Sequence, residues 1–142
     1  MKVLLAVDGS KNAMDAVECL VRHAAWYREE PEIELVTVHL PVPKVRGLGK
    51  FVGRRELQRY YDEEGQASLE RAAGRLARAG MQFERRVLVG PIAESIVKHA
   101  EKTGCDLILL GTRGMSATAN ALLGSTATKL MQIATTPVML VR

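Results

Sequence analysis

Two groups of residues in the second half of the chain have the types and the spacing to bind an anion. Gly111, Thr112, Arg113 and Gly114 are followed by nine residues and then by Gly124, Ser125 and Thr126. An apolar run at 106–110 precedes the first group and predicts a buried strand, while helical spacing follows the second. Glycines let the backbone approach an anion, and the free N–H groups in the first turn of a helix point toward it. The pattern therefore predicts a phosphate site and makes a nucleotide the first candidate ligand.

A third polar group, Asp8-Gly9-Ser10, follows the apolar run at residues 3–7. In open parallel sheets, ligands bind beyond the C-terminal ends of the strands, where the winding order reverses. If the strands before Asp8 and Gly111 are neighbours, the Asp8 carboxylate faces the glycine loop and can accept a hydrogen bond from a ribose hydroxyl or a base amine. The alternative is that Asp8 caps the helix that begins near Lys11, a role that Ser10 can fill equally well.

The elements that must position these residues alternate between strand and helix. Apolar runs predict strands at 3–7, 33–40, 83–89, 106–110 and 137–141, and helical spacing predicts helices at 11–30, 56–79, 91–102 and 124–134. Strands separated by helices of this length imply parallel pairing in a three-layer α/β sheet. The length of 142 residues, 47% of them hydrophobic and 25% charged, predicts a single globular domain over residues 1–142.

The net charge of +4 is concentrated in one segment. Between residues 44 and 59 the basic residues are Lys44, Arg46, Lys50, Arg54, Arg55 and Arg59, against the single acid Glu56. Nucleic-acid binders spread basic residues along a face and add aromatic side chains, which make up only 4% of this chain. We therefore expect no nucleic-acid partner. Residues 41–53, with two prolines and three glycines, predict a long loop that is either a lid over the nucleotide or a solvated insertion.

Cysteine usage and hydropathy indicate the compartment. Cys19 and Cys105 lie far apart and lack metal-ligand spacing, so we expect neither a disulfide framework nor a metal site. The apolar run at the N-terminus is interrupted at Asp8, too early for a signal peptide, and no run reaches the length of a membrane span. The expectation is a cytoplasmic protein without a membrane segment.

In their order and spacing, these motifs resemble those of the universal stress protein family over essentially the whole chain. The resemblance rests on Val7-Asp8-Gly9-Ser10, on the segment 90–96 and above all on the pattern Gly-x2-Gly-x9-Gly-Ser/Thr. It implies an adenine nucleotide α-hydrolase-like fold, in which an open sheet of five parallel strands in the order 3-2-1-4-5 is covered by four helices in three layers. It also implies a homodimer that forms through the fifth, C-terminal strand.

The glycine pattern is typical of the branch of this family that binds ATP, and every fixed position of the pattern is present. The resemblance implies that Asp8 and the backbone of Leu40 contact the base and ribose. The residues implied to hold the phosphates and ribose are Leu110, Gly111, Arg113, Gly114, Gly124, Ser125 and Thr126. For Arg113 the alternative is a side chain that lies in solvent. We expect ATP, with Mg²⁺, to be the cofactor.

The expected chemistry is binding with little or no turnover. A Walker A loop needs a lysine before its Ser/Thr, whereas Gly124 precedes Ser125 here, and no acidic pair or histidine base accompanies the glycines. The leading interpretation is an ATP-binding stress-response regulator whose nucleotide state is read by unidentified protein partners. The alternatives are a slow ATPase or nucleotidyl enzyme on the same fold and a nucleotide-independent interaction module. The choice among ATP, AMP and cyclic AMP as cellular ligand stays open.

Overall fold

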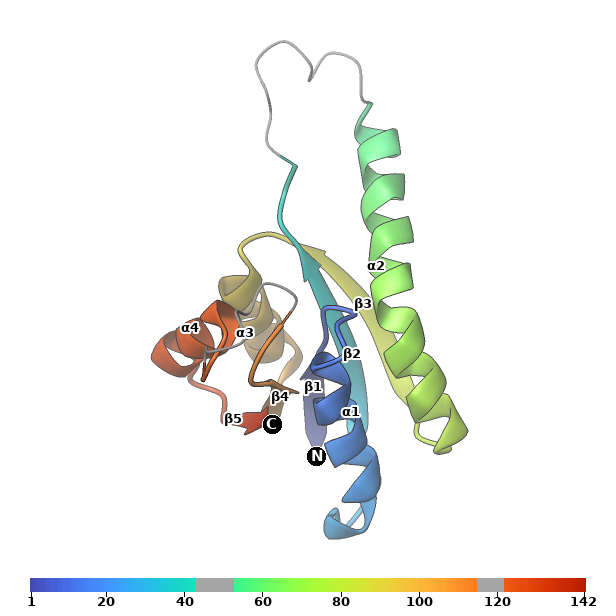
Figure 1. Cartoon of the computed structure of the whole chain (residues 1–142), viewed down its shortest axis with the longest axis vertical. Helices are drawn as coiled ribbons and strands as arrows, with labels where there is room; N and C mark the ends of the chain where they lie inside the picture. The colour runs from blue at the N-terminus through green and yellow to red at the C-terminus, as the bar shows by residue number, and fades with distance from the viewer. Residues whose placement is uncertain (43–52, 115–121) are drawn as a thin grey trace.

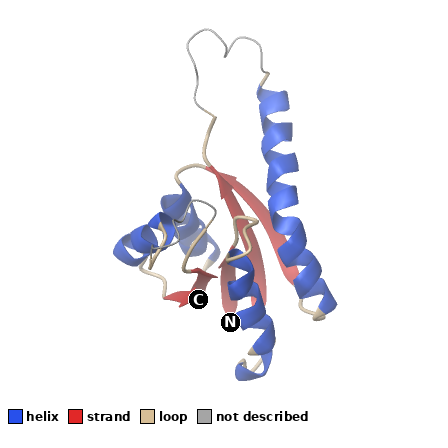
Figure 2. Ribbon diagram, viewed as in Figure 1, coloured by secondary structure: helices blue, strands red, loops and turns tan. Residues whose placement is uncertain are grey.

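The computed structural model describes residues 1–42, 53–114 and 122–142. Five strands, β1 (Lys2–Ala6), β2 (Glu32–His39), β3 (Phe83–Val89), β4 (Leu107–Gly111) and β5 (Val138–Val141), form one parallel sheet in the order β3-β2-β1-β4-β5 (Figures 1 and 2). This confirms the predicted sheet and its strand order. The predicted lid or solvated insertion falls mostly on residues 43–52, which lie outside the described residues.

Four helices cover the sheet, two on each face. The α1 (Ala13–Arg22) and α2 (Arg54–Arg78) helices share one hydrophobic core with Val3 and Leu5 of β1. The α3 (Ile92–Thr103) and α4 (Ser125–Ile133) helices share the other core with Leu4 and Ala6. Successive side chains of a strand point to opposite faces, so the apolar run of β1 supplies both cores. Within the described ranges, none of the helices is both long enough and apolar enough for a membrane crossing.

The α1 helix is shorter than the 11–30 predicted from its apolar spacing. It ends at Arg22, and a short 3-10 helix, Ala24–Trp26, follows it. Pro31 disfavours the helical conformation for Glu30 because its ring collides with the backbone of the preceding residue. The periodic apolar positions continue as far as Tyr27, which packs against the core from outside the α-helix. The predicted extension of the helix to Glu30 is therefore wrong.

The strand order places the ends of β1 and β4 side by side. Val3 pairs with Leu107 of β4 on one side and with Ile33 of β2 on the other. The chain runs from β1 outward to β2 and β3, and then returns to β4 and β5 on the other side of β1. The winding order therefore reverses between β1 and β4, the position at which open α/β sheets bind their ligands.

Candidate functional site

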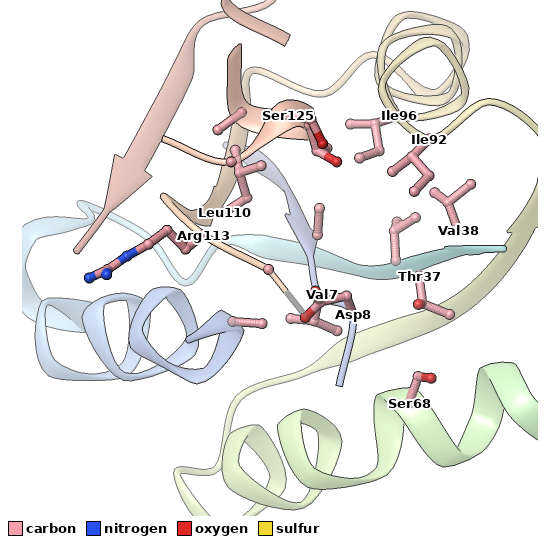
Figure 3. A pocket seen from close by; sticks show the side chains of 18 of the residues that line it. Val7, Asp8, Thr37, Val38, Ser68, Ile92, Ile96, Leu110, Arg113 and Ser125 are labelled. Carbon is pink, nitrogen blue, oxygen red and sulfur yellow. The ribbon is translucent and has the colours of Figure 1, made fainter. Parts of the chain in front are cut away.

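A cavity of about 240 Å³ lies at the C-terminal ends of β1, β2 and β4 (Figure 3). It brings together every predicted site residue except Leu40, although these residues come from segments more than a hundred positions apart. The predicted residues that line the cavity are Asp8, Leu110, Gly111, Arg113, Gly114, Gly124, Ser125 and Thr126. Two motifs that are separate in the sequence therefore form one site.

Leu40 lies just after β2, and its side chain is 62% exposed. The cavity is lined instead by the C-terminal half of β2 itself, namely Val36, Thr37, Val38 and His39. The role predicted for Leu40 depended on its backbone and stays a prediction.

The sequence left open whether Asp8 faces the ligand or caps the helix that follows, and the structure gives the two roles to different residues. The Ser10 hydroxyl accepts a hydrogen bond of 3.1 Å from the Ala13 N–H at the start of α1. The Asp8 carboxylate accepts one of 3.0 Å from the Ser10 N–H. The N-cap position of α1 is Asn12, whose side chain makes no capping bond, and Ser10 instead satisfies the first N–H of the helix. The half-buried Asp8 carboxylate lies on the cavity wall.

The three glycines of the motif have different surroundings. A Cβ atom on Gly111 would lie 2.7 Å from the backbone oxygen of Asn12, so only glycine lets the end of β4 approach the start of α1 this closely. A Cβ on Gly114 would lie 2.5 Å from the Asp8 carboxylate. A Cβ on Gly124 would make only ordinary contacts of 3.5 Å. Gly111 therefore serves packing, Gly114 gives room to Asp8, and the protein itself does not require glycine at position 124.

The N-terminus of α4 faces this cavity. The Gly124 N–H donates to the Thr112 carbonyl at 2.7 Å, which ties the start of α4 to the end of β4. The Gly124 carbonyl accepts from Thr128 at 3.0 Å, so the N–H groups of Ser125, Thr126 and Ala127 precede the first bond within the helix. In the described part of the chain no side chain caps this end. These donors and the positive end of the helix dipole can bind an anion.

The cavity has an apolar side and a polar side (Figure 3). Val38, Ile92, Ile96 and Leu110 supply apolar side chains that can pack against a flat aromatic ring. Thr37 of β2 and Ser68 of α2 lie near Asp8 on the polar side, whereas the Arg113 guanidinium points away from them.

Sequence reasoning missed the contributions from α2, α3 and the interior of β2. Thr37 offered a signal in the sequence, because it is a polar residue between Val36 and Val38, and the structure buries it to 2% exposure. Ser68 offered none, since a serine in the middle of a helix is usually solvated. Ile92 and Ile96 were recognisable only as core positions of α3, and not as residues of a cavity.

The charges of the cavity bear on the expected Mg²⁺. Among the residues that line it, the fully charged side chains are Asp8 and Arg113. The described ranges contain no group of three or more His, Cys, Asp and Glu side chains that could hold a metal ion. Mg²⁺ is commonly bound through one or two carboxylates together with substrate phosphates. The Asp8 carboxylate beside an anion site fits a Mg²⁺ that arrives with the nucleotide.

Comparison with known proteins shows the same architecture in relatives. The model of the universal stress protein family matches residues 1–142. Universal stress protein YxiE of Bacillus subtilis (strain 168) is 32% identical over 149 residues, covering 99% of this chain and 98% of the relative. The solved structure of the hypothetical protein MJ0577 of Methanocaldococcus jannaschii has a TM-score of 0.82 and 26% identity, over 99% of this chain and 94% of that one. A solved universal stress protein in complex with cAMP has a TM-score of 0.68 and 26% identity, over 100% and 97% of the two chains.

Proposed function

Because this chain belongs to the universal stress protein family, we propose that it is an ATP-binding member of that family, which acts as a cytoplasmic, nucleotide-dependent regulator. The observation that carries the proposal is the cavity in which Asp8, the glycine motif and the N-terminus of α4 come together. The relative solved with cAMP supports an adenine nucleotide as the class of ligand. ATP is favoured within this class because the chain retains the complete glycine pattern.

Each part of the cavity has a proposed role in holding the nucleotide. The N–H groups of Ser125 and Thr126, with the backbone of Gly111 and Gly114, bind the phosphates. Asp8 accepts a hydrogen bond from the ribose or base, and the apolar side packs against the base. Arg113 binds a phosphate after a change of rotamer, Leu40 contributes through its backbone, and Mg²⁺ accompanies the phosphates near Asp8. Leu110 and Gly124 complete the walls.

The proposed activity is binding with little or no hydrolysis. Phosphoryl transfer needs neutralisation of the developing charge and a positioned nucleophile. The cavity offers one arginine and one carboxylate as its fully charged lining groups, which supports a binding role over a catalytic one. We further propose that residues 1–142 form a single domain, that two copies pair through β5, and that protein partners read the bound nucleotide.

The test begins with protein purified without added nucleotide. We expect mass spectrometry of the heat-released ligand to detect an adenine nucleotide, and calorimetry of the stripped protein to give a Kd for ATP of about 1 μM, or about −8 kcal/mol. Incubation with ATP and Mg²⁺ should release little ADP. Sustained hydrolysis would favour the enzyme, and a stripped protein that binds no adenine nucleotide would refute the proposed function.

A matched pair of glycine variants tests the site itself. Gly114→Val places a side chain where the Asp8 carboxylate lies, so it should abolish ATP binding while the chain stays folded. Gly74→Ala, in α2, has its nearest neighbour at 3.5 Å and should bind ATP like the wild type. Wild-type affinity in folded Gly114→Val would show that the site assignment is wrong.

A further inference from the structure

A second cavity, of about 400 Å³, runs along α3 beside the end of β3, the strand at one edge of the sheet. Ile92 and Ile96, on another side of the same helix, line the cavity of the candidate site, and the two cavities have no lining residue in common. We call the second cavity the α3 groove. Its walls are residues 88–91 and, on α3, Glu94, Ser95, Lys98, His99 and Lys102.

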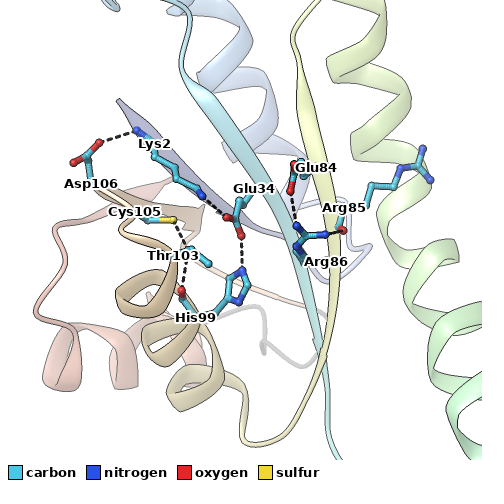
Figure 4. Close-up of polar contacts among 9 residues, drawn as sticks. All are labelled: Lys2, Glu34, Glu84, Arg85, Arg86, His99, Thr103, Cys105 and Asp106. Atoms are coloured by element: carbon cyan, nitrogen blue, oxygen red, sulfur yellow. Dashed lines mark hydrogen bonds and ion pairs between the residues drawn. The ribbon is translucent and has the colours of Figure 1, made fainter.

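The α3 wall of this groove is positively charged. The Lys98 and Lys102 side chains are exposed, and neither forms an ion pair with another of the described residues. Glu94 is the one acidic residue among the described side chains that line the groove. The His99 side chain is 14% exposed, and the buried Glu34 carboxylate fixes its ring (Figure 4). Two lysines against one carboxylate favour an anionic occupant.

The end of the groove at the start of α3 is apolar. Leu88, Val89 and Pro91 line it, and Val89 is 42% exposed. A Cβ on Gly90 would lie 2.6 Å from Ser95 Oγ, so the glycine leaves room for this hydroxyl beside the apolar residues. An occupant of the groove therefore meets an apolar surface and a hydroxyl at one end and, further along the helix, two ammonium groups.

The spacing of the lysines indicates what kind of anion fits. Lys98 and Lys102 are four residues apart on one face of α3, which separates them by about 6 Å along the helix axis. In an extended peptide, alternate side chains point to the same side at intervals of about 6.6 Å. Small-molecule sites enclose most of their ligand, whereas the exposed Val89, Lys98 and Lys102 leave this groove open to solvent. A peptide segment therefore fits the groove better than a small molecule.

We propose that the α3 groove is a docking site for an extended acidic segment of a protein partner. Two carboxylates at alternate positions of the segment bind Lys98 and Lys102, and an apolar side chain of the segment packs against Leu88 and Val89. The inference rests on the proposed function in that it gives a surface to the partner that reads the bound nucleotide. The contact itself involves no residue of the nucleotide cavity.

The test is an NMR titration of the ¹⁵N-labelled full chain with a capped hexapeptide of sequence LVESES. We expect the peptide to shift the amides of α3 and of the end of β3, and to bind more weakly as salt is added. The peptide LVQSQS, which lacks the carboxylates, should bind about five- to ten-fold more weakly. The double variant Lys98→Gln, Lys102→Gln should weaken binding of LVESES by the same factor, because two exposed ion pairs are lost.

The matched control is the double variant Lys11→Gln, Lys129→Gln, which removes two other exposed lysines that line neither cavity and should bind LVESES like the wild type. All four positions are exposed, and the amide spectrum of each variant shows whether it is folded. The titration is repeated with glutarate, a small dicarboxylate.

Three results would overturn the inference. The first is that LVESES at about 1 mM shifts no amide of α3, and the second is wild-type affinity in folded Lys98→Gln, Lys102→Gln. The third is binding of glutarate as tight as that of LVESES, which would make the groove a site for small anions. A chain that binds LVESES in the groove but binds no adenine nucleotide would instead refute the proposed function and leave the docking site standing.

Discussion

At the scale of single residues, the main polar feature outside the cavity is a buried cluster centred on Glu34. This residue lies within β2 and is 4% exposed. Its carboxylate accepts from the Lys2 ammonium of β1 at 2.6 Å and pairs with His99 Nε2 of α3 (Figure 4). Burial alone would raise the pKa of Glu34, but the hydrogen bonds from Lys2 and His99 outweigh burial and hold that pKa below its ordinary value of 4.5. The cluster ties two strands to the helix that covers them.

The lowered pKa of Glu34 makes this stabilisation dependent on pH. A carboxyl with a lower pKa in the folded state stabilises the fold above its unfolded pKa, and the contribution is lost as the pH falls through the folded value. We expect Glu34→Gln to lower the free energy of unfolding by roughly 2 kcal/mol at about pH 7, because Lys2 and His99 lose their charged acceptor. Urea denaturation should show this difference shrinking below the ordinary pKa of 4.5.

Glu84 provides the control for this prediction. It stands opposite Glu34 in the register between β2 and β3, but its side chain is 68% exposed and pairs with Arg86 at the surface. Glu84→Gln should cost less than about 1 kcal/mol at any pH. Equal destabilisation by both substitutions, or a Glu34→Gln effect that persists unchanged in acid, would contradict the prediction.

The residues of the cavity differ in how well the sequence could predict them. Asp8, Gly111 and Gly114 were predictable because they lie at or just after the end of an apolar strand. A close approach of backbones also demands glycine, since a Cβ on Gly111 would lie only 2.7 Å from the Asn12 oxygen. Ser68 and His39 were not, because their position at the cavity depends on how α2 and β2 pack against each other, which no local pattern encodes. Ser10 and Asp8 were equivalent as helix caps until the hydrogen bonds distinguished them.

At the scale of elements, α2 is positioned by a glycine. A Cβ on the buried Gly65 would lie 2.4 and 2.5 Å from the two methyl carbons of Val87 in β3. Ser68 follows three residues later, on the same face of the helix, and lines the cavity. The close packing at Gly65 therefore also sets how near Ser68 comes to the ligand site.

The same substitution at two positions of α2 should have opposite effects. Gly65→Ala forces β3 and α2 apart and should lower stability by about 1–3 kcal/mol. Gly74→Ala, where the nearest atom is the Arg78 guanidinium at 3.5 Å, should raise stability by about 0.5–1 kcal/mol, because alanine is the better helix former. Thermal unfolding of the two variants measures both. A stabilising Gly65→Ala would mean that α2 does not pack on β3 as closely as described.

Strands were predicted more accurately than the ends of helices. The bounds of β3 are those expected, since its last three residues, Val87, Leu88 and Val89, are apolar and end at a clear turn at Gly90. The end of α1 was missed because amphipathic spacing continues past Arg22 to Tyr27, while the chain had already left the α-helix at His23. The spacing of apolar residues indicates which of them face the core. It does not indicate whether they belong to an α-helix or to an irregular segment that follows it, such as the 3-10 helix Ala24–Trp26.

At the scale of the whole molecule, the two edges of the sheet differ in charge. The β3 edge carries Glu84, Arg85 and Arg86, and Arg85 pairs with Glu70 of α2 at 3.0 Å. The β5 edge, Val138–Val141, contains no charged residue. Charged side chains protect an edge strand from pairing with another chain, whereas an apolar edge presents free N–H and C=O groups. Of the two edges, β5 is therefore the one suited to pair with a second copy.

The proposed dimer is best tested at Met139. Val138 and Leu140 pack against the core beneath α3 and α4, so changing either would disturb the fold as well as an interface. Met139 points to the opposite face and is 41% exposed, so Met139→Lys should leave the monomer folded. Antiparallel pairing of two β5 strands about a twofold axis would bury the Met139 side chain and satisfy the edge without open-ended assembly. A lysine buried there without a partner would destabilise the dimer.

Sedimentation at tens of micromolar should therefore show a dimer for the wild type and a monomer for Met139→Lys. The matched control is Tyr60→Lys, which changes another half-exposed side chain, on the α2 helix that packs on β2 and β3 near the opposite edge of the sheet, and should remain dimeric. ATP binding by the monomeric variant would show that each copy holds a complete site. A monomeric wild type, or a dimer that Met139→Lys leaves intact, would exclude pairing through β5.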